Sequence, residues 1–155
     1  MTVTMSNQII VFIFAVLTLF SAVVGEIITF DNCATNKDKC TIHEVRMDPC
    51  KEAAAKKPCK VKKGKPGSIE IDYTPHFDSD TLTGTATYLG QLLPNMETNA
   101  CLTSPCPVVS GNKQTYTYQL LIDRIFPSGI FDVHWTLTGQ NEGDHCCVST
   151  KIFLK

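Results

Sequence analysis

The sequence lacks an apolar run long enough to span a membrane as a helix. The longest run, Ile9 to Phe20, contains 12 residues, whereas a transmembrane helix needs about 20. Small residues follow from Ser21 to Gly25, and residues 1–8 contain no Lys or Arg, so the amino terminus is the only positive charge there. A short apolar run followed by small residues is typical of a signal peptide. We therefore predict a signal peptide at residues 1–25 and one domain at residues 26–155, with a retained N-terminal anchor as the alternative.

The signatures of common catalytic sites are also missing. The sequence contains no Gly-x-Ser-x-Gly motif, no Gly-rich phosphate loop and no paired-carboxylate motif. The four His residues do not have the spacing of a metal site: His43, His76, His134 and His145. The formal net charge of −1 excludes a strongly basic nucleic-acid-binding protein. We therefore expect a protein that is not an enzyme, that uses no cofactor or metal, and that does not bind nucleic acid.

Cysteine, by contrast, is abundant. All eight Cys residues follow the predicted signal peptide: Cys33, Cys40, Cys50, Cys59, Cys101, Cys106, Cys146 and Cys147. An even number of Cys behind a signal peptide indicates a disulfide framework. We expect four bridges, no free thiol, and a secreted, extracellular protein, with the endosomal or lysosomal lumen as an alternative location.

Strict alternation of apolar and polar residues is clearest between Thr115 and Thr138. Two alternating runs flank a turn signal at Pro127 to Gly129, and the second run carries the only Trp. Alternation with a period of two predicts half-buried β-strands, and the turn signal favours an antiparallel hairpin. The apolar face of this hairpin must be buried, either against a second sheet alone or against a second sheet and a ligand.

The rest of the domain shows further strand patterns and no long helix. Strands are predicted at 26–30, 40–47, 67–74, 81–89 and 146–154, and a helical turn at Ala53 to Ala55. The inward face of 81–89 is not defined by its Thr-rich pattern. About seven short strands separated by Gly and Pro turn signals predict an all-β protein, a β-sandwich.

Several short motifs together resemble one protein family over nearly all of residues 30–155. They are Phe30-Asp31-Asn32-Cys33, Asp48-Pro49-Cys50 with Pro58-Cys59, Leu93-Pro94, Cys101 with Cys106-Pro107-Val108, Tyr116-Thr117-Tyr118, Val133-His134-Trp135 and the Cys near the start of the last strand. The chain thereby resembles the ML lipid-recognition family, and its secreted sterol-transfer branch more than its allergen or co-receptor branches. The resemblance implies an immunoglobulin-like sandwich of two antiparallel sheets, held by disulfides, with a hydrophobic cavity between the sheets that takes a lipid.

The resemblance also implies which residues contact the lipid. The expected lipid-binding residues are Leu93, Ile122, Phe126, Trp135, Val45, Met47, Val61, Ile71, Tyr118 and Val133. Leu93 and Phe126 stand where the sterol-transfer branch has Phe and Tyr, so an apolar ligand is expected without its identity. For the alternating strand residues, ordinary core packing is the favoured interpretation: Ile69, Ile71, Tyr73, Leu120, Phe131 and Val133.

The family resemblance further implies a disulfide pattern. It supplies Cys50–Cys59 and Cys101–Cys106 as small loops, and a long bridge from Cys33 to the last strand. Cys40 is then expected to pair with the other member of the Cys146-Cys147 pair. We favour Cys33–Cys146 and Cys40–Cys147, because Cys146 shares a strand face with Val148 and Ile152; the swapped pairing is the alternative.

Two functions stay open at this point. The first is a monomeric, secreted carrier that binds a small apolar lipid, such as a sterol, fatty acid or hydrophobic signal molecule, and transports or transfers it. The second is a lipid-dependent interaction protein or co-receptor in innate immune recognition. The Lys-rich stretch Lys51 to Lys65 is interpreted as a solvated loop. A transient contact with an anionic membrane or a receptor is the alternative, but the stretch itself offers no exposed apolar anchors.

Overall fold

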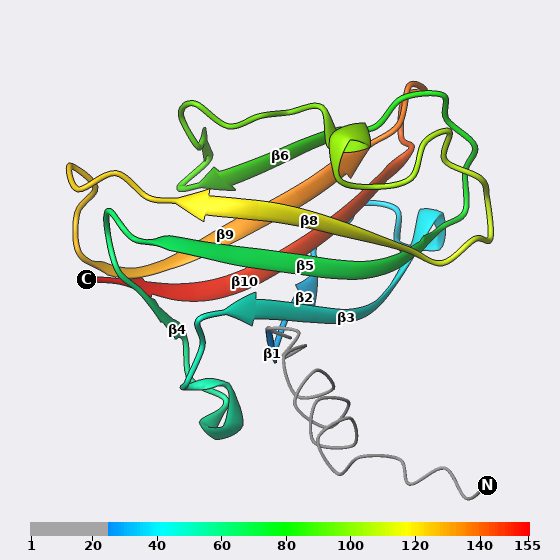
Figure 1. Ribbon diagram of the computed structural model, residues 1–155. Coiled ribbons are helices and arrows are strands. Elements are labelled where there is room, and N and C mark those ends of the chain that lie inside the picture. The colour runs from blue at the N-terminus through cyan, green and yellow to red at the C-terminus, as the bar shows by residue number, and fades with distance from the viewer. Residues whose placement is uncertain (1–24) are drawn as a thin grey trace, which may run out of the picture.

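A computed structural model describes residues 25–155, which fold as two β-sheets packed face to face (Figure 1). The four-stranded sheet has the order β1 (Glu26–Ile27), β3 (Cys40–Asp48), β5 (Pro66–Pro75), β8 (Gln114–Leu121). The six-stranded sheet has the order β2 (Asp31–Asn32), β10 (His145–Leu154), β9 (Gly129–Thr138), β6 (Thr83–Tyr88), β7 (Gln91–Leu92), and β4 (Cys59–Val61) pairs with β10. Every pairing is antiparallel except β4 with β10, so the predicted all-β sandwich of two antiparallel sheets is confirmed.

The core lies between the sheets, and the alternation in sequence decides which side chains enter it. On β5, Ile69, Ile71 and Tyr73 are almost completely buried, whereas the residues between them face outward or lie at the edge of the core. In register, Ile69 lies opposite Met47 of β3 and Tyr118 of β8. Side chains opposite one another in antiparallel strands share a face, so one face of the four-stranded sheet is apolar across its width.

The predicted hairpin between Thr115 and Thr138 is wrong. β8 pairs with β5 in one sheet, whereas β9 pairs with β10 and β6 in the other. Figure 1 shows the two strands in different layers, joined by a connection that crosses from one sheet to the other. Residues 122–128 are too many for a tight turn. The two apolar faces therefore do not form one surface but face each other across the core.

Four disulfides are present, and no described cysteine is free. Two of them close small loops, Cys50–Cys59 and Cys101–Cys106. The two long bridges are Cys33–Cys147 and Cys40–Cys146, so the favoured pairing of Cys33 with Cys146 and Cys40 with Cys147 is wrong.

The observed pairing follows from the directions in which Cys146 and Cys147 point. β2 pairs with β10 at Asn32 and Val148, which brings Cys33 opposite Cys147, and the Cys33 amide donates to the Cys147 carbonyl at 3.1 Å. Cys146 points inward, with 1% of its surface exposed, and reaches Cys40 at the start of β3 in the opposite sheet. An inward-facing Cys is thus suited to bridge between sheets, whereas an outward-facing one bridges within a sheet.

Short helical turns and the Lys-rich segment complete the fold. The 3₁₀ turns are η1 (Lys37–Lys39), η2 (Ala53–Ala55) and η3 (Ala100–Leu102), of which η2 is the predicted Ala-rich turn. Within residues 25–155, no helix is long and apolar enough to cross a membrane. The predicted signal peptide lies outside the described residues, apart from Gly25.

Candidate functional site

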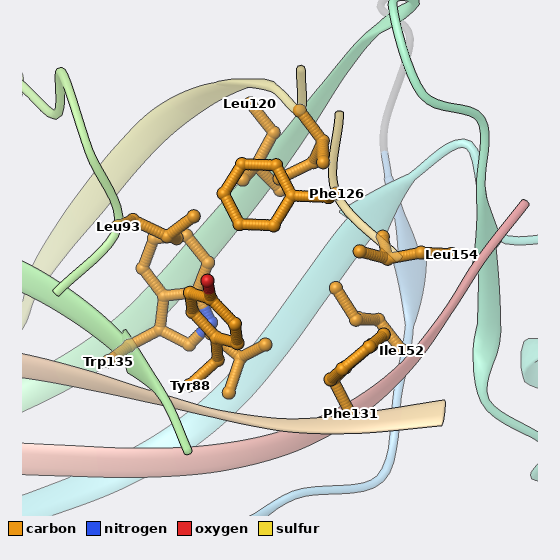
Figure 2. Close-up of a pocket in the computed structure, with 10 residues that line it drawn as sticks. Tyr88, Leu93, Leu120, Phe126, Phe131, Trp135, Ile152 and Leu154 are labelled. Atoms are coloured by element: carbon orange, nitrogen blue, oxygen red, sulfur yellow. The ribbon is translucent and has the colours of Figure 1, made fainter. Parts of the chain in front are cut away.

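An apolar cavity lies between the sheets at the end where β8 and β10 finish and β9 begins (Figure 2). Its walls come from both sheets, from the connection that follows β7 and from the connection that follows β8. The ten wall residues are Tyr88, Leu93, Leu120, Ile122, Phe126, Phe131, Val133, Trp135, Ile152 and Leu154. The centre of a water molecule can occupy only about 20 Å³ of it. That is space for one or two water molecules. In this conformation the side chains nearly fill the cavity.

Aromatic rings close one side of the cavity. The ring of Tyr88, at the end of β6, meets Phe126 edge-on at a centroid distance of 5.4 Å and Phe131 at 6.0 Å. Deeper in the wall, Trp135 packs against Tyr118 with ring centroids 5.8 Å apart. Edge-to-face contacts hold rings in place without the close interdigitation of aliphatic side chains, so such a wall can rearrange by ring rotation.

A solvent-open groove of about 730 Å³ lies next to the cavity. It runs along the connection that leaves β8, residues 122–126, and faces residues 93–95. Four side chains belong to both the cavity and the groove: Leu93, Leu120, Ile122 and Phe126. These four apolar side chains, called the partition below, border both the cavity and the groove.

The Lys-rich segment holds the partition in place from outside. The ammonium group of Lys63 donates hydrogen bonds to the Phe126 carbonyl at 2.9 Å and to the Ser128 hydroxyl at 3.0 Å. The amide of Gly64 donates to the Ile122 carbonyl at 2.7 Å. Both ends of the 122–126 connection are therefore tied to residues 63–64, which sequence reasoning assigned to a solvated loop.

The rim of the groove carries exposed apolar side chains. Ile125 is 85% exposed and Leu121 is 71% exposed, and both line the groove. Exposed Arg124 and Asp123 also line the groove, and exposed Lys62 and Lys65 flank Gly64, a groove residue that approaches the Arg124 side chain closely. Apolar tips beside basic residues are the composition of a membrane-contacting surface.

The structure brings together only part of the predicted lipid-binding set. Leu93, Ile122, Phe126, Val133 and Trp135 line the cavity, and Tyr118 lines the groove. Four others do not line the closed cavity and are buried in the core: Val45, Met47, Val61 and Ile71.

Val45, Met47 and Ile71 lie away from the cavity in the four-stranded sheet, whereas Val61 lies beside a wall residue. Val45 and Met47 lie on β3, which is two strands away from β8 in the four-stranded sheet. Val61 lies on β4, opposite Leu154. Ile71 pairs with Tyr116, whose buried ring occupies the middle of the core.

Five wall residues were not in the predicted set: Tyr88, Leu120, Phe131, Ile152 and Leu154. Leu120, Phe131, Ile152 and Leu154 were expected on inward strand faces, but alternation alone does not separate cavity wall from core. Tyr88 carried no such signal, because the Thr-rich pattern of β6 leaves its inward face undefined.

The outer face of the four-stranded sheet carries a charge network instead of a pocket. Arg46 donates hydrogen bonds to Asp72 at 3.0 and 3.2 Å and to Glu70 at 2.9 Å, and the Thr115 hydroxyl donates to Asp72 at 2.7 Å. Burial by itself raises the pKa of Asp72, but the bonds from Arg46 and Thr115 outweigh it and lower the pKa to about 2. This network fastens β3, β5 and β8 together on the side away from the cavity.

Among residues 25–155, no three His, Cys, Asp or Glu side chains are placed to hold a metal ion. The chemistry available at the cavity is therefore that of an apolar wall with a narrow, closable entrance. Such a wall binds through burial of apolar surface.

Comparison with known protein families shows that the ML domain matches residues 28–154. The chain belongs to this family. It is 32% identical over 130 residues to the MD-2-related lipid-recognition protein of Manduca sexta, covering 81% of this chain and 84% of that protein. It is 30% identical over 141 residues to the mite group 2 allergen Der f 2 of Dermatophagoides farinae, covering 85% and 89%.

A solved structure of the same shape supports the fold of this ML domain. The crystal structure of a Niemann-Pick type C2 protein from Japanese carpenter ant matches it with a TM-score of 0.69, covering 82% of this chain and 99% of that one. The two sequences are 14% identical, so the likeness concerns the fold alone. The family predicted from short motifs is confirmed.

Proposed function

We propose that this ML domain is a secreted carrier that takes up a small apolar lipid between its two sheets and releases it again. One observation carries the proposal: the apolar cavity adjoins an open groove, and the partition of Leu93, Leu120, Ile122 and Phe126 borders both. The ten wall residues include no charged side chain, so selectivity rests on apolar burial. Membership of a family with a lipid-recognition relative supports the same function.

Uptake requires the wall to open. The space in the closed cavity is far too small for a lipid chain, so the ligand must displace the partition and separate the sheets. Burial of a chain of sixteen carbons provides on the order of 10 kcal/mol, at about 0.8 kcal/mol per CH₂. Side-chain rearrangement and the loss of translational freedom subtract from this, which leaves micromolar binding or tighter within reach.

The four disulfides support action outside the cell. Bridges persist in oxidising compartments, and a pair of long bridges at one end of the sandwich lets the other end open without loss of the fold. Binding without catalysis is the proposed activity, since the site offers apolar surface and no positioned nucleophile, acid or base.

A second mode of action, delivery by contact with an anionic membrane, is favoured by the groove rim. The exposed Ile125 and Leu121 supply the apolar anchors that the Lys-rich stretch lacks; Arg124 lines the same groove, and Lys62 and Lys65 flank its Gly64. Each basic residue near an anionic leaflet contributes about 1 kcal/mol. We therefore propose that the groove rim faces the membrane during transfer, in place of the purely aqueous carriage favoured by the sequence.

The test of the carrier function begins with the secreted protein. Mass spectrometry of the native protein should show a co-purifying lipid, and the delipidated protein should reload from donor vesicles and pass the lipid to acceptor vesicles unaided. Stable binding without any spontaneous exchange would instead favour a co-receptor. Absence of binding by sterols, fatty acids and neutral long-chain lipids alike would contradict the proposal.

A further inference from the structure

The indole nitrogen of Trp135 is a buried hydrogen-bond donor without a partner. Trp135 is 2% exposed, and its Nε1–H contacts no acceptor among the described residues. Figure 2 shows the nitrogen on the side of the ring that is turned toward the other wall residues. Trp135 lines the cavity but not the groove, so its ring belongs to the inner wall rather than to the partition.

The rest of the core contrasts with this arrangement. The buried Tyr73 hydroxyl has two partners, Ser104 at 3.0 Å and Gln114 at 2.9 Å. Among the described residues, the only other fully buried side-chain polar atom without a partner is the Thr150 hydroxyl. Thr150 lies on β10, opposite Val133 of β9, the strand that carries Trp135. Both unpartnered groups are buried in the same sheet.

An unpaired buried donor destabilises a folded protein, because the group loses its bond to water without gaining another. Such groups are rare, and each one in a native structure asks for an explanation. Here the explanation is chemical: the indole N–H can only donate, so whatever satisfies it must bring an acceptor.

The remaining wall limits which acceptor can enter. Of the ten wall residues, only Tyr88 and Trp135 carry a polar side-chain atom, and none is cationic. A carboxylate buried there would have no counter-charge, which makes its ionised form costly. A neutral oxygen needs one donor and suits the site.

We propose that the ligand is a lipid with a neutral acceptor oxygen, a ketone, ester or hydroxyl, that passes the partition and accepts a hydrogen bond from Trp135 Nε1. This inference rests on the proposed lipid carriage and narrows its ligand class. A pure hydrocarbon leaves the indole unpaired.

The experiment compares two probes that differ by one oxygen, 2-hexadecanone and hexadecane. Both displace N-phenyl-1-naphthylamine from the delipidated full domain, and the displacement gives their relative affinities. We expect the ketone to bind at least tenfold more tightly than the hydrocarbon. We also expect the ketone alone to shift the emission of Trp135, the single Trp of the chain, to longer wavelength.

Two variants of the donor and one control locate the effect. Trp135→Phe removes the N–H and some volume; replacement of Trp135 by benzothienylalanine in a tryptophan-auxotrophic host exchanges only N–H for sulfur. Tyr88→Phe removes the other polar atom of the wall and serves as the matched control. The preference for the ketone should vanish in both Trp135 variants and persist in Tyr88→Phe.

The outcomes separate this inference from the carrier function. Equal affinity of the wild-type protein for both probes overturns the inference and leaves the carrier function standing, as does a preference that survives in the benzothienylalanine variant. A preference lost in Tyr88→Phe assigns the donor to Tyr88 and also overturns it. Failure of both probes to bind contradicts the carrier function itself.

Discussion

At the residue scale, two neighbours where β8 ends differ sharply in their surroundings. Ile122 is 4% exposed and belongs to the partition, whereas Leu121 is 71% exposed at the groove rim. Adjacent residues of similar chemistry thus provide a matched pair for testing the cavity.

We predict that Ile122→Asp abolishes most lipid binding and still folds. A carboxylate in the partition is costly to bury against an apolar ligand, but in the free protein it can turn into the groove and reach water. Binding should weaken about tenfold or more, which corresponds to about 1.4 kcal/mol or more. Leu121→Asp should bind as the wild type does. Unchanged uptake by a well-folded Ile122→Asp protein would remove Ile122 from the site.

Asp72 supports a second prediction at this scale, because its pKa of about 2 lies below the ordinary value of 3.8. A carboxylate whose pKa is lower in the folded state stabilises the protein above its unfolded pKa, and this stabilisation is lost as the pH falls from about 4 to about 2. Asp72→Asn should therefore lower the free energy of unfolding at pH 7 by about 2 kcal/mol.

The measurement is urea unfolding of both proteins between pH 2 and pH 7. The difference between wild type and Asp72→Asn should shrink toward zero as the pH approaches 2. Asp132→Asn, which breaks the exposed pair between Asp132 and Lys151, is the control and should change stability little. A difference that stays constant with pH would show that the Asp72 charge is not what stabilises the sheet.

At the scale of elements, the connection between β8 and β9 is held by a neighbouring segment rather than by itself. Lys63 bonds the Phe126 carbonyl and the Ser128 hydroxyl, while the adjacent Lys62 is exposed and makes no side-chain hydrogen bond among the described residues. Among the lysine side chains of this stretch, Lys63 is thus the one that holds the partition, together with the Gly64 amide.

We predict that Lys63→Met accelerates lipid exchange. The substitution keeps the apolar stem but removes the two donated bonds, so the partition opens more readily. A loss of about 1 kcal/mol from the opening barrier raises the exchange rate roughly fivefold. Stopped-flow release of a bound fluorescent fatty acid measures this rate, with Lys62→Met as the control. Equal rates in the two variants would mean that Lys63 does not hold the partition.

The two long disulfides also act together as one element. Cys33–Cys147 and Cys40–Cys146 are nested: their first Cys residues are seven positions apart and their second Cys residues are one position apart. When either bridge is present, the other closes a loop of only about eight residues. In the chain-entropy account that second bridge contributes roughly 2–3 kcal/mol, whereas the first contributes roughly 5.

We therefore predict a strongly non-additive pair. Replacing Cys40 and Cys146 by Ala, or Cys33 and Cys147 by Ala, should each cost roughly 2–3 kcal/mol, and removing both bridges should cost roughly 7. Guanidinium unfolding of the refolded proteins measures the three values. A cost for the quadruple variant equal to the sum of the two pair removals would contradict the nested-loop explanation.

At the scale of the whole molecule, the exposed Leu121 and Ile125 lie at the cavity end, where β8 finishes, while the two long bridges fasten the start of β10 at the opposite end. The β-sandwich is thus bridged at one end and carries an apolar groove rim at the other. This polarity favours transfer in which the groove meets the membrane.

We predict that transfer to acceptor vesicles rises with their anionic lipid content and falls with salt. The Debye length decreases from about 10 Å at 0.1 M to about 3 Å at 1 M, which weakens attraction between the basic residues near the groove and the leaflet.

Ile125→Ser and the pair Lys62→Glu and Lys65→Glu should each slow transfer severalfold and leave equilibrium affinity unchanged, since none of these residues lines the cavity. Ile130→Ser, another exposed apolar change outside the groove, is the control. Rates independent of salt, charge and these variants would restore the aqueous carrier.

Sequence reasoning was sufficient for features that depend on local pattern. The alternation of Ile69, Ile71 and Tyr73 predicted an inward face of β5, and short motifs identified the family. The family resemblance also predicted Leu93, Ile122 and Phe126 as lipid-binding residues, and all three line the cavity. Alternation reports which side of a strand is buried, because side chains on a strand point to opposite faces in turn.

The sequence by itself therefore determined the all-β class, the buried faces and the family, whereas only the tertiary structure decided which faces meet. Alternation around Pro127 to Gly129 is the same for a hairpin and for strands in opposite sheets, because period two contains no information about the partner strand. The vicinal Cys146 and Cys147 were ambiguous for a related reason: each needs a partner on its own side of β10, and that partner is set by the packing of distant segments. The cavity arose in the same way, where β8, β9, β10 and β6 diverge at one end of the sandwich, a distance between sheets that no single strand encodes.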